Sequence, residues 1–318
     1  MKILVTGGAG FIGSNLALKL KDLGYKVAVI DNLDPYYQLK LKKFNLTKLK
    51  KNSITFNKID IRNGGKVLAF FKEFKPDIVV HLAAKAGVRN SLLYPDEYFS
   101  VNVQGTLNIL EAARVVKVKK LMIASSSSVY GNNKKVPFSE DDLTENQISP
   151  YAASKKAMET LIRMYSSTYS LNTQIFRFFT VYGPSGRPDM APAIFTKAVE
   201  RGQHLTIFGG LDTSRDYTFI EDILGGLVQA LGLNERFNIY NLGNNKTVRL
   251  HEFIEAIEKA SLKKAKIKII GKRQGDAEIT WADIEKAKKN FGYSPKTSIQ
   301  EGMKRFVAWF KESSSLYD

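Results

Sequence analysis

Two residues four positions apart, Tyr151 and Lys155, carry side chains suited to acid–base chemistry. Residues at this spacing lie on the same face of a helix, so the phenol and the ammonium would be neighbours. A tyrosine is a weak base at its ordinary pKa of about 10, but a nearby cation stabilises the phenolate and lowers that pKa. Because the same spacing also occurs on ordinary exposed helices, the pair indicates chemistry only when a second motif accompanies it.

The second motif is Gly7-x-x-Gly10-x-x-Gly13, close to the N-terminus. An apolar, β-branched run over residues 2–6 precedes it, and residues 11–23 have the apolar spacing of a helix. Strand, glycine turn and helix, followed by a second strand that ends in an acid, are the pattern of a Rossmann dinucleotide site. The alternative, a glycine-rich turn with only a structural role, fits this setting less well.

The acid at the end of the second strand is Asp31, and its type predicts which dinucleotide binds. Its carboxylate can accept hydrogen bonds from the adenosine ribose hydroxyls, and the glycines let the backbone approach the pyrophosphate. The negative charge would repel a 2′-phosphate, and the next residue is Asn32 rather than an arginine. We therefore expect NAD rather than NADP. A hydride acceptor beside Tyr151 would oxidise a secondary alcohol.

The composition excludes several other kinds of chemistry. The chain has 318 residues, enough for a one- or two-domain α/β enzyme, and no cysteine, which rules out disulfides, thiolate catalysis and cysteine zinc sites. Its three histidines are scattered, and His81 follows an apolar run as a structural residue at a strand end would. We expect no metal site. The sequence shows no secretion signal and no apolar run of membrane-spanning length, so we expect a cytoplasmic protein without a membrane partner.

The net charge of +17 suits polyanionic partners, which include nucleic acids, acidic membranes and nucleotide sugars. Lysines are densest between Lys40 and Lys51, where they alternate with apolar residues. A basic amphipathic helix could lie on a membrane or a duplex. The more ordinary interpretation is an apolar side in the core and a solvated lysine side. No nucleic-acid-binding motif is visible, so we expect no nucleic-acid partner.

The order of the elements predicts the fold class. Apolar strand-like runs alternate with helices through about the first 180 residues, the pattern of a doubly wound parallel sheet. From Thr180 onward, glycine and proline become frequent, and residues 237–242 look like a strand that returns to the sheet. We expect a Rossmann domain of residues 1–180 with 220–248, and a smaller α/β substrate domain of 181–219 and 249–318. The polar tail, residues 312–318, should fray.

Taken together, these motifs identify a family. The chain resembles the extended short-chain dehydrogenases/reductases, in the group of nucleotide-sugar epimerases and dehydratases. The resemblance covers the chain from Met1 to about Phe310 in the family's order. The motifs that carry it are Thr6–Gly13 (TGGAGFIG), Asp60-Ile61, His81–Ala84 (HLAA), Asn102, Ser125–Gly131 (SSSSVYG), Tyr151–Lys155 (YAASK), Arg177–Pro184 (RFFTVYGP) and Arg215–Asp222 (RDYTFIED).

The resemblance implies tightly held NAD, a UDP- or dTDP-sugar substrate, and a catalytic set of Ser126, Tyr151 and Lys155. It places the cofactor on Gly7, Gly10, Phe11, Ile12, Gly13, Asp31, Asn32, Asp60, Ile61, Leu82, Ala83, Ala84, Asn102, Tyr151 and Lys155. It places the substrate on Arg89, Ser126, Ser127, Ser128, Tyr151, Thr180, Arg187, Arg215, Arg273 and Asp276. Within that set, the two arginines Arg215 and Arg273 would hold the diphosphate, for which a guanidinium fork is suited.

Within the group, the chain looks most like the UDP-glucuronate 4-epimerases. Dehydratases usually carry Asp-Glu in place of Ser127-Ser128, decarboxylases carry Glu in place of Ser128, and UDP-glucose epimerases carry Asn in place of Thr180. The three hydroxyls found here suit a carboxylate, because each can donate a hydrogen bond and none is charged. The segment Gly186–Met190 also matches, and Arg187 could add a charge-assisted contact. Lys85 departs from the pattern, which usually has Gln there.

The resemblance implies inversion of the sugar at C4 through a 4-keto intermediate, which would interconvert UDP-glucuronate and UDP-galacturonate. Two alternatives stay open at this point. One is an epimerase acting on UDP-glucose or UDP-N-acetylglucosamine. The other, more distant, is a non-enzymatic protein that binds dinucleotides and nucleic acid. Relatives commonly pair through helices near residues 101–115 and 151–165, which implies a homodimer.

Overall fold

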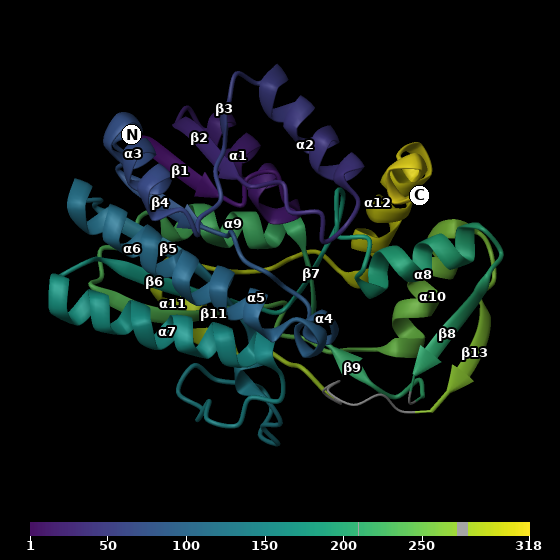
Figure 1. Ribbon diagram of the computed structural model, residues 1–318. Coiled ribbons are helices and arrows are strands. Elements are labelled where there is room, and N and C mark those ends of the chain that lie inside the picture. The colour runs from purple at the N-terminus through teal and green to yellow at the C-terminus, as the bar shows by residue number, and fades with distance from the viewer. Residues whose placement is uncertain (209, 272–278) are drawn as a thin grey trace.

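A seven-stranded sheet lies at the centre of the computed structural model, which describes residues 1–208, 210–271 and 279–318. All seven strands are parallel, in the order β11-β6-β5-β4-β1-β2-β3 (Figure 1). They are β1 (Lys2–Thr6), β2 (Lys26–Asp31), β3 (Thr55–Lys58), β4 (Ile78–His81), β5 (Lys120–Ser126), β6 (Thr173–Phe178) and β11 (Phe237–Leu242). The strand order reverses between β1 and β4, which confirms the predicted doubly wound fold and puts a ligand crevice at their carboxyl ends.

Helices cover both faces of this sheet. Successive residues of β1 point to opposite faces, with Ile3 and Val5 in one core cluster and Leu4 in the other. The face of Leu4 is covered by α3 (Gly64–Phe74), α6 (Gly105–Val116) and α7 (Pro150–Tyr169). The opposite face is covered by α1 (Phe11–Asp22), α9 (Ile220–Ala230) and α11 (Glu285–Phe291). Burial on both faces explains the continuous apolar strands of the sequence.

The lysine-rich segment forms the helix α2 (Leu39–Lys51). This helix has an apolar side in the core and a solvated lysine side, as in the more ordinary of the two interpretations. Leu41 and Leu49 are buried in the core, while the ammonium groups of Lys40 and Lys43 are exposed. Lys42 is the exception, because its side chain is buried near the glycine turn. No helix among the described residues is long and apolar enough to span a membrane.

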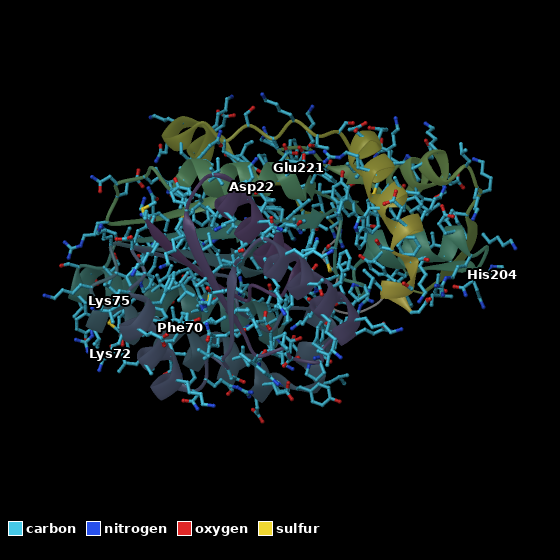
Figure 2. All side chains as sticks on the ribbon, turned by 90° about the horizontal axis from the view of Figure 1, so that it is seen from above. Asp22, Phe70, Lys72, Lys75, His204 and Glu221 are labelled. Atoms are coloured by element: carbon cyan, nitrogen blue, oxygen red, sulfur yellow. The ribbon has the colours of Figure 1, made fainter. Side chains whose placement is uncertain are left out.

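A second lobe lies to one side of the sheet and is built from two separate stretches of chain (Figure 1). Its elements are α8 (Ala191–Glu200), β8 (His204–Phe208), α10 (Leu250–Ser261), β13 (Lys266–Ile270) and α12 (Ile299–Glu312). β8 and β13 pair in parallel, although β11 lies between them in the sequence. Seen from above in Figure 2, Lys72 of α3 and Lys75, which follows its end, lie at one end of the molecule and His204 at the other.

The C-terminal segment is ordered, so the prediction that it frays is wrong. Residues Ser314–Tyr317 form a 3₁₀ turn, and the Tyr317 side chain is buried. Its ring packs against Trp309 and Phe310, and its hydroxyl donates a hydrogen bond to the Gly186 carbonyl oxygen at 2.7 Å. Burial of one large aromatic side chain outweighs the polar composition of the segment, on which the prediction rested.

Candidate active site

The glycine turn between β1 and α1 leaves no room for side chains. Gly7 has a φ of +70°, and a Cβ added there would lie 2.8 Å from the Ala83 nitrogen. A Cβ on Gly13 would lie 2.3 Å from the Gly7 carbonyl oxygen. The turn therefore packs tightly against the start of α1 and the end of β4, and it exposes backbone N–H groups at a helix N-terminus. This cradle fits the pyrophosphate of a dinucleotide.

Asp31, at the end of β2, braces the same turn. Its carboxylate accepts hydrogen bonds from the backbone N–H of Ala9 at 3.1 Å and of Leu33 at 2.8 Å. The Lys42 ammonium lies 3.6 Å from the carboxylate, and both side chains are buried. The position of Asp31 fits hydrogen bonds to the adenosine ribose. Lys42 is a contact that the sequence analysis missed, because nothing in a run of lysines distinguishes the one that turns inward.

This contact sharpens the prediction for the cofactor. The wild-type protein should bind NAD better than NADP, and Asp31→Ala should improve NADP binding about tenfold, since Lys42 would then face the 2′-phosphate unpaired. Calorimetric titration with both dinucleotides at matched salt measures this. The control is Asp31→Ala combined with Lys42→Met, which should gain no affinity for NADP. Equal wild-type affinity for both dinucleotides would contradict the prediction.

The predicted acid–base pair lies on α7, whose start is well defined. Ser149 caps the helix by accepting a hydrogen bond from the Ala152 N–H, and Pro150 occupies its first position. Tyr151 and Lys155 therefore project from adjacent turns of one face. Lys155 is only 3% exposed, and its ammonium donates to the Ala124 carbonyl oxygen of β5 at 2.9 Å.

Burial and neighbouring charges set the pKa values of this pair. Burial lowers the pKa of Lys155 to about 8, against the opposing effect of the Glu159 carboxylate. Burial raises the pKa of Tyr151, while a hydrogen bond from Ser126 and the positive charge of Arg187 lower it. Arg187 thus joins the groups that favour the phenolate, a role that the sequence analysis did not assign to it.

The pKa of Lys155 has a consequence for the pH dependence of turnover. The ammonium loses its proton above about pH 8. We expect the protonated form to favour the Tyr151 phenolate when the cofactor is bound, so kcat should fall on the alkaline side. Lys155→Met should abolish this alkaline limb and move the acid limb upward. Initial rates at saturating NAD, followed through the neutral and alkaline range, measure both limbs. An alkaline limb that persists unchanged in Lys155→Met would assign it to another group.

A single cavity of about 410 Å³ joins the glycine turn to this pair. Its volume lies within the usual range for ligand sites. It is lined by Gly7, Gly10, Phe11, Ile12, Gly13, Asp31, Asn32, Ile61, Leu82, Ala83, Ala84, Ser126, Ser127, Ser128, Tyr151, Lys155, Thr180 and Arg187 among the predicted residues. The structure therefore brings together most of the predicted cofactor residues and the predicted hydroxyls in one place.

The hydroxyl groups are held at the junction of β5 and β7 (Thr180–Tyr182). Ser126 ends β5, accepts a hydrogen bond from the Ser128 N–H at 3.2 Å, and so starts a 3₁₀ turn over residues 127–130. The backbone N–H of Thr180 donates to the Asp216 carbonyl oxygen at 3.0 Å, which fixes the start of β7, and Thr180 lines the same cavity as the serines. The site thus presents several uncharged donors at one end of the cavity.

Arg187 is held in the same cavity by a bridge between the two lobes. Its guanidinium donates to the Asp189 carboxylate at 2.5 Å and lies over the Tyr36 ring, 5.4 Å from the centroid. The Tyr36 hydroxyl also donates to Asp189, at 3.0 Å. Tyr36 belongs to the loop after β2, which connects the cofactor half of the cavity to the half that carries Arg187. No sequence motif signalled this contact.

Four predicted residues do not line the cavity. The Asp60 carboxylate accepts hydrogen bonds from Arg62 and from Asn32, which itself lines the cavity. Asn102, fully buried in a π-helical turn, bonds both backbone groups of Lys85. The other two are Arg89, which lies 5.9 Å over the Phe208 ring, and Arg215, which donates to the Ser214 carbonyl oxygen. Predicted residues Arg273 and Asp276 lie outside the described residues.

Lys85, the departure from the family pattern, lines the cavity and forms ion pairs at its edge. Its ammonium lies 3.4 Å from the Asp34 carboxylate and also contacts Glu97. These partners raise the pKa of Lys85 against the effect of burial. The lysine therefore links the loop after β2 to α5 (Pro95–Phe99). This arrangement depends on segments far apart in the sequence.

The sheet, the glycine turn and the Tyr–Lys pair define the class, an extended short-chain dehydrogenase/reductase. A sequence profile of the family described as GDP-mannose 4,6 dehydratase matches residues 4–306, and the chain belongs to this family. It is 42% identical to a UDP-glucuronate 4-epimerase of Thermodesulfobacterium geofontis, over 98% of this chain and 97% of that one. The family identified from the sequence is confirmed.

Solved structures agree with this assignment. A Bacillus cereus UDP-glucuronic acid 4-epimerase, solved with UDP-glucuronic acid and NAD, is 36% identical with a TM-score of 0.92, over 98% of this chain and 100% of that one. A Thermotoga maritima UDP-glucose 4-epimerase, solved with UDP-glucose, is 31% identical with a TM-score of 0.92, over 99% and 100%. The two likenesses support the same fold and leave the sugar to be argued from the site.

Proposed function

We propose that the protein is an NAD-dependent UDP-sugar 4-epimerase that interconverts UDP-glucuronate and UDP-galacturonate. The observation that carries the proposal is the lining of the cavity that contains Tyr151. This lining includes the hydroxyl-bearing residues Ser127, Ser128 and Thr180 and the cation of Arg187. Such a set can donate several hydrogen bonds to a sugar carboxylate, and Arg187, although paired with Asp189, adds a charge-assisted donor. Two relatives named as UDP-glucuronate 4-epimerases, at 42% and 36% identity, support this choice of sugar.

The residues divide the work of the reaction between them. Tyr151, as phenolate, accepts the proton of the C4 hydroxyl, and Ser126 hydrogen-bonds the same oxygen. Lys155 holds the nicotinamide ribose and keeps a positive charge beside the phenol. The glycine turn would hold NAD, which would supply the hydride acceptor for C4 and the hydride donor that restores it. After the 4-keto sugar turns about its diphosphate link, the hydride would return to the opposite face of C4, and Tyr151 gives the proton back to the C4 oxygen.

The nucleotide end of the substrate is assigned by the resemblance. We propose that residues 181–219 and 249–318 form the substrate domain, and residues 1–180 with 220–248 the cofactor domain. Arg215 and Arg273 would hold the diphosphate and Asp276 the nucleoside ribose. The support is the fit of a guanidinium fork to phosphate oxygens and the position of Arg215 in β9 (Ser214–Arg215), within the second lobe.

One experiment tests the function directly. The purified protein is incubated separately with UDP-glucuronate, UDP-glucose and UDP-N-acetylglucosamine, and the products are separated by chromatography. We expect UDP-galacturonate from the first and far slower turnover of the other two. Preferential epimerisation of UDP-glucose or UDP-N-acetylglucosamine would support the alternative epimerases. No turnover of any sugar, with NAD bound, would support the non-enzymatic alternative.

We also propose that the protein is a cytoplasmic homodimer. Helices α6 and α7 pack together and leave large apolar side chains exposed, among them Val115, Met164 and Tyr169 at 43–46%. A second copy of the chain would cover them. Light scattering after size-exclusion chromatography should give the dimer mass, and Val115→Glu with Met164→Glu should give a monomer. A monomeric wild type would contradict the dimer.

A further inference from the structure

The helix α7 and the strand β5 are joined by three side-chain contacts, spaced one helical turn apart along α7. Each of these contacts is called a level below. Tyr151, Lys155 and Glu159 follow at four-residue spacing on one face of the helix. Each contacts one of the last three residues of β5. Ser126 hydrogen-bonds Tyr151, the Ala124 carbonyl accepts from Lys155 at 2.9 Å, and the Ser125 hydroxyl donates to Glu159 at 2.5 Å. The first two levels carry the acid–base pair, and the third has no part in the chemistry so far.

A buried arginine completes the third level. The Arg177 guanidinium, on the neighbouring strand β6, donates to both Glu159 oxygens, at 3.0 and 2.8 Å. The two charged side chains are each only 3% exposed. Arg177 also donates to the Tyr130 hydroxyl at 3.0 Å and lies 4.8 Å over its ring. Tyr130 ends the 3₁₀ turn that carries Ser127 and Ser128, so one ion pair holds both the catalytic helix and the serine turn.

Stability alone does not explain this pair. Taking two charges out of water is costly, and apolar side chains of similar volume often stabilise a core as well or better. A bidentate Arg–carboxylate pair does fix geometry closely, because both partners are planar and each hydrogen bond is directional. The Glu159–Arg177 pair lies one helical turn from the acid–base pair, where a fixed geometry matters most for proton transfer.

We propose that Glu159 and Arg177 are positioning residues for the reaction. They fix the position of α7 along its axis relative to β5, and this position places Tyr151 and Lys155. They also orient the serine turn through Tyr130. The inference rests on the proposed function only through the roles of Tyr151 and Lys155. It concerns any sugar that the wild-type protein turns over.

The charges around Lys155 make the proposal testable by pH. From its own helix, Tyr151 and Glu159 face it, and the Glu159 carboxylate raises the pKa of Lys155. From β4 comes His81, which lies between the hydroxyls of Thr6 and Thr106 and stays neutral, since burial and the Lys155 charge lower its pKa to about 3. From β5, the Ala124 carbonyl oxygen accepts the hydrogen bond of Lys155. On β6, Arg177 is paired to Glu159. Removing the Glu159 charge therefore leaves the positive charge of Arg177 unpaired near Lys155. This charge favours the neutral form of Lys155.

The test compares Glu159→Gln with Arg177→Lys. Glu159→Gln should lower kcat about 10–100-fold with little change in KM and should move the alkaline limb of the pH profile to lower pH. Arg177→Lys keeps the charge but loses the bidentate geometry, so kcat should fall with the limb in its wild-type place. Ser125→Ala should behave like Arg177→Lys, more weakly. Wild-type kcat and an unmoved limb in Glu159→Gln would overturn the proposal.

A second variant keeps the test valid if a lone buried charge prevents folding. Glu159→Leu with Arg177→Met removes both charges and leaves none unpaired. Circular dichroism and NAD titration should then match the wild type, while kcat falls at least tenfold. Full turnover in this double variant would show that the pair is only structural and would overturn the proposal. Failure of the proposed function would instead appear in the wild-type protein, as no turnover of UDP-glucuronate.

Discussion

Tyr151→Phe should reduce turnover about 10²–10⁴-fold and leave the fold and NAD binding intact. The substitution removes only the hydroxyl that accepts the C4 proton. The ring keeps its edge-to-face contact with Tyr98, whose centroid lies 6.1 Å away. Initial rates with UDP-glucuronate, together with NAD titration, measure the two parts of this result. Residual activity above about a tenth of the wild-type value would contradict the assignment of Tyr151 as the proton acceptor.

Tyr182→Phe is a matched control for this experiment. The Tyr182 side chain is buried, and its hydroxyl has no hydrogen-bond partner among the described residues. Tyr182 does not line the cavity that contains Tyr151. Losing its hydroxyl should therefore leave kcat and KM close to wild type. A similar loss of turnover in both variants would indicate a general effect of removing buried hydroxyls.

The second large effect concerns the fate of the carboxylate. Oxidation of UDP-glucuronate at C4 makes a β-keto acid, which can lose its carboxylate as carbon dioxide. That loss requires the C5–carboxylate bond roughly perpendicular to the carbonyl plane, and it spreads negative charge away from the carboxylate. Hydrogen bonds from Ser127, Ser128 and Thr180 would oppose both, by fixing the orientation and by stabilising the localised charge. An epimerase needs such protection for the lifetime of the intermediate.

Thr180→Ala, or Ser127→Ala with Ser128→Ala, should therefore raise the fraction of decarboxylated 4-keto-pentose. Hydrogen bonds to a charged group contribute about 1.5–3 kcal/mol each, enough to change a partition ratio tenfold or more. Mass spectrometry of the UDP-sugar products measures this ratio, and Tyr182→Phe again serves as the control. Variants that lose activity with no rise in decarboxylated product would show that these hydroxyls do not protect the carboxylate.

Local patterns predicted the fold class and the main motifs of the site, because each strand, helix and motif consists of residues close in sequence. The glycine turn with its flanking strands and the Tyr151–Lys155 spacing are patterns of this kind. The missed contacts join distant segments. The inward turn of Lys42, the ion pairs of Lys85 and the Glu159–Arg177 pair all depend on how helices and strands pack. Spacing rules do not describe such packing. For the same reason, they could not show that Asp60 and Asn102 do not line the cavity.

The path of the chain through the sheet also bears on how this protein can change over evolution. The chain leaves the sheet after β6, returns as β11 and leaves again, so the second lobe has no contiguous gene segment of its own. Because two separate stretches of sequence encode the second lobe, exchange of one continuous gene segment would not replace it as a whole. We expect new sugar preferences in this architecture to arise from substitutions of residues that line the cavity outside the acid–base pair. The acid–base pair on α7 stays untouched by such changes, which lets one chemistry serve many substrates.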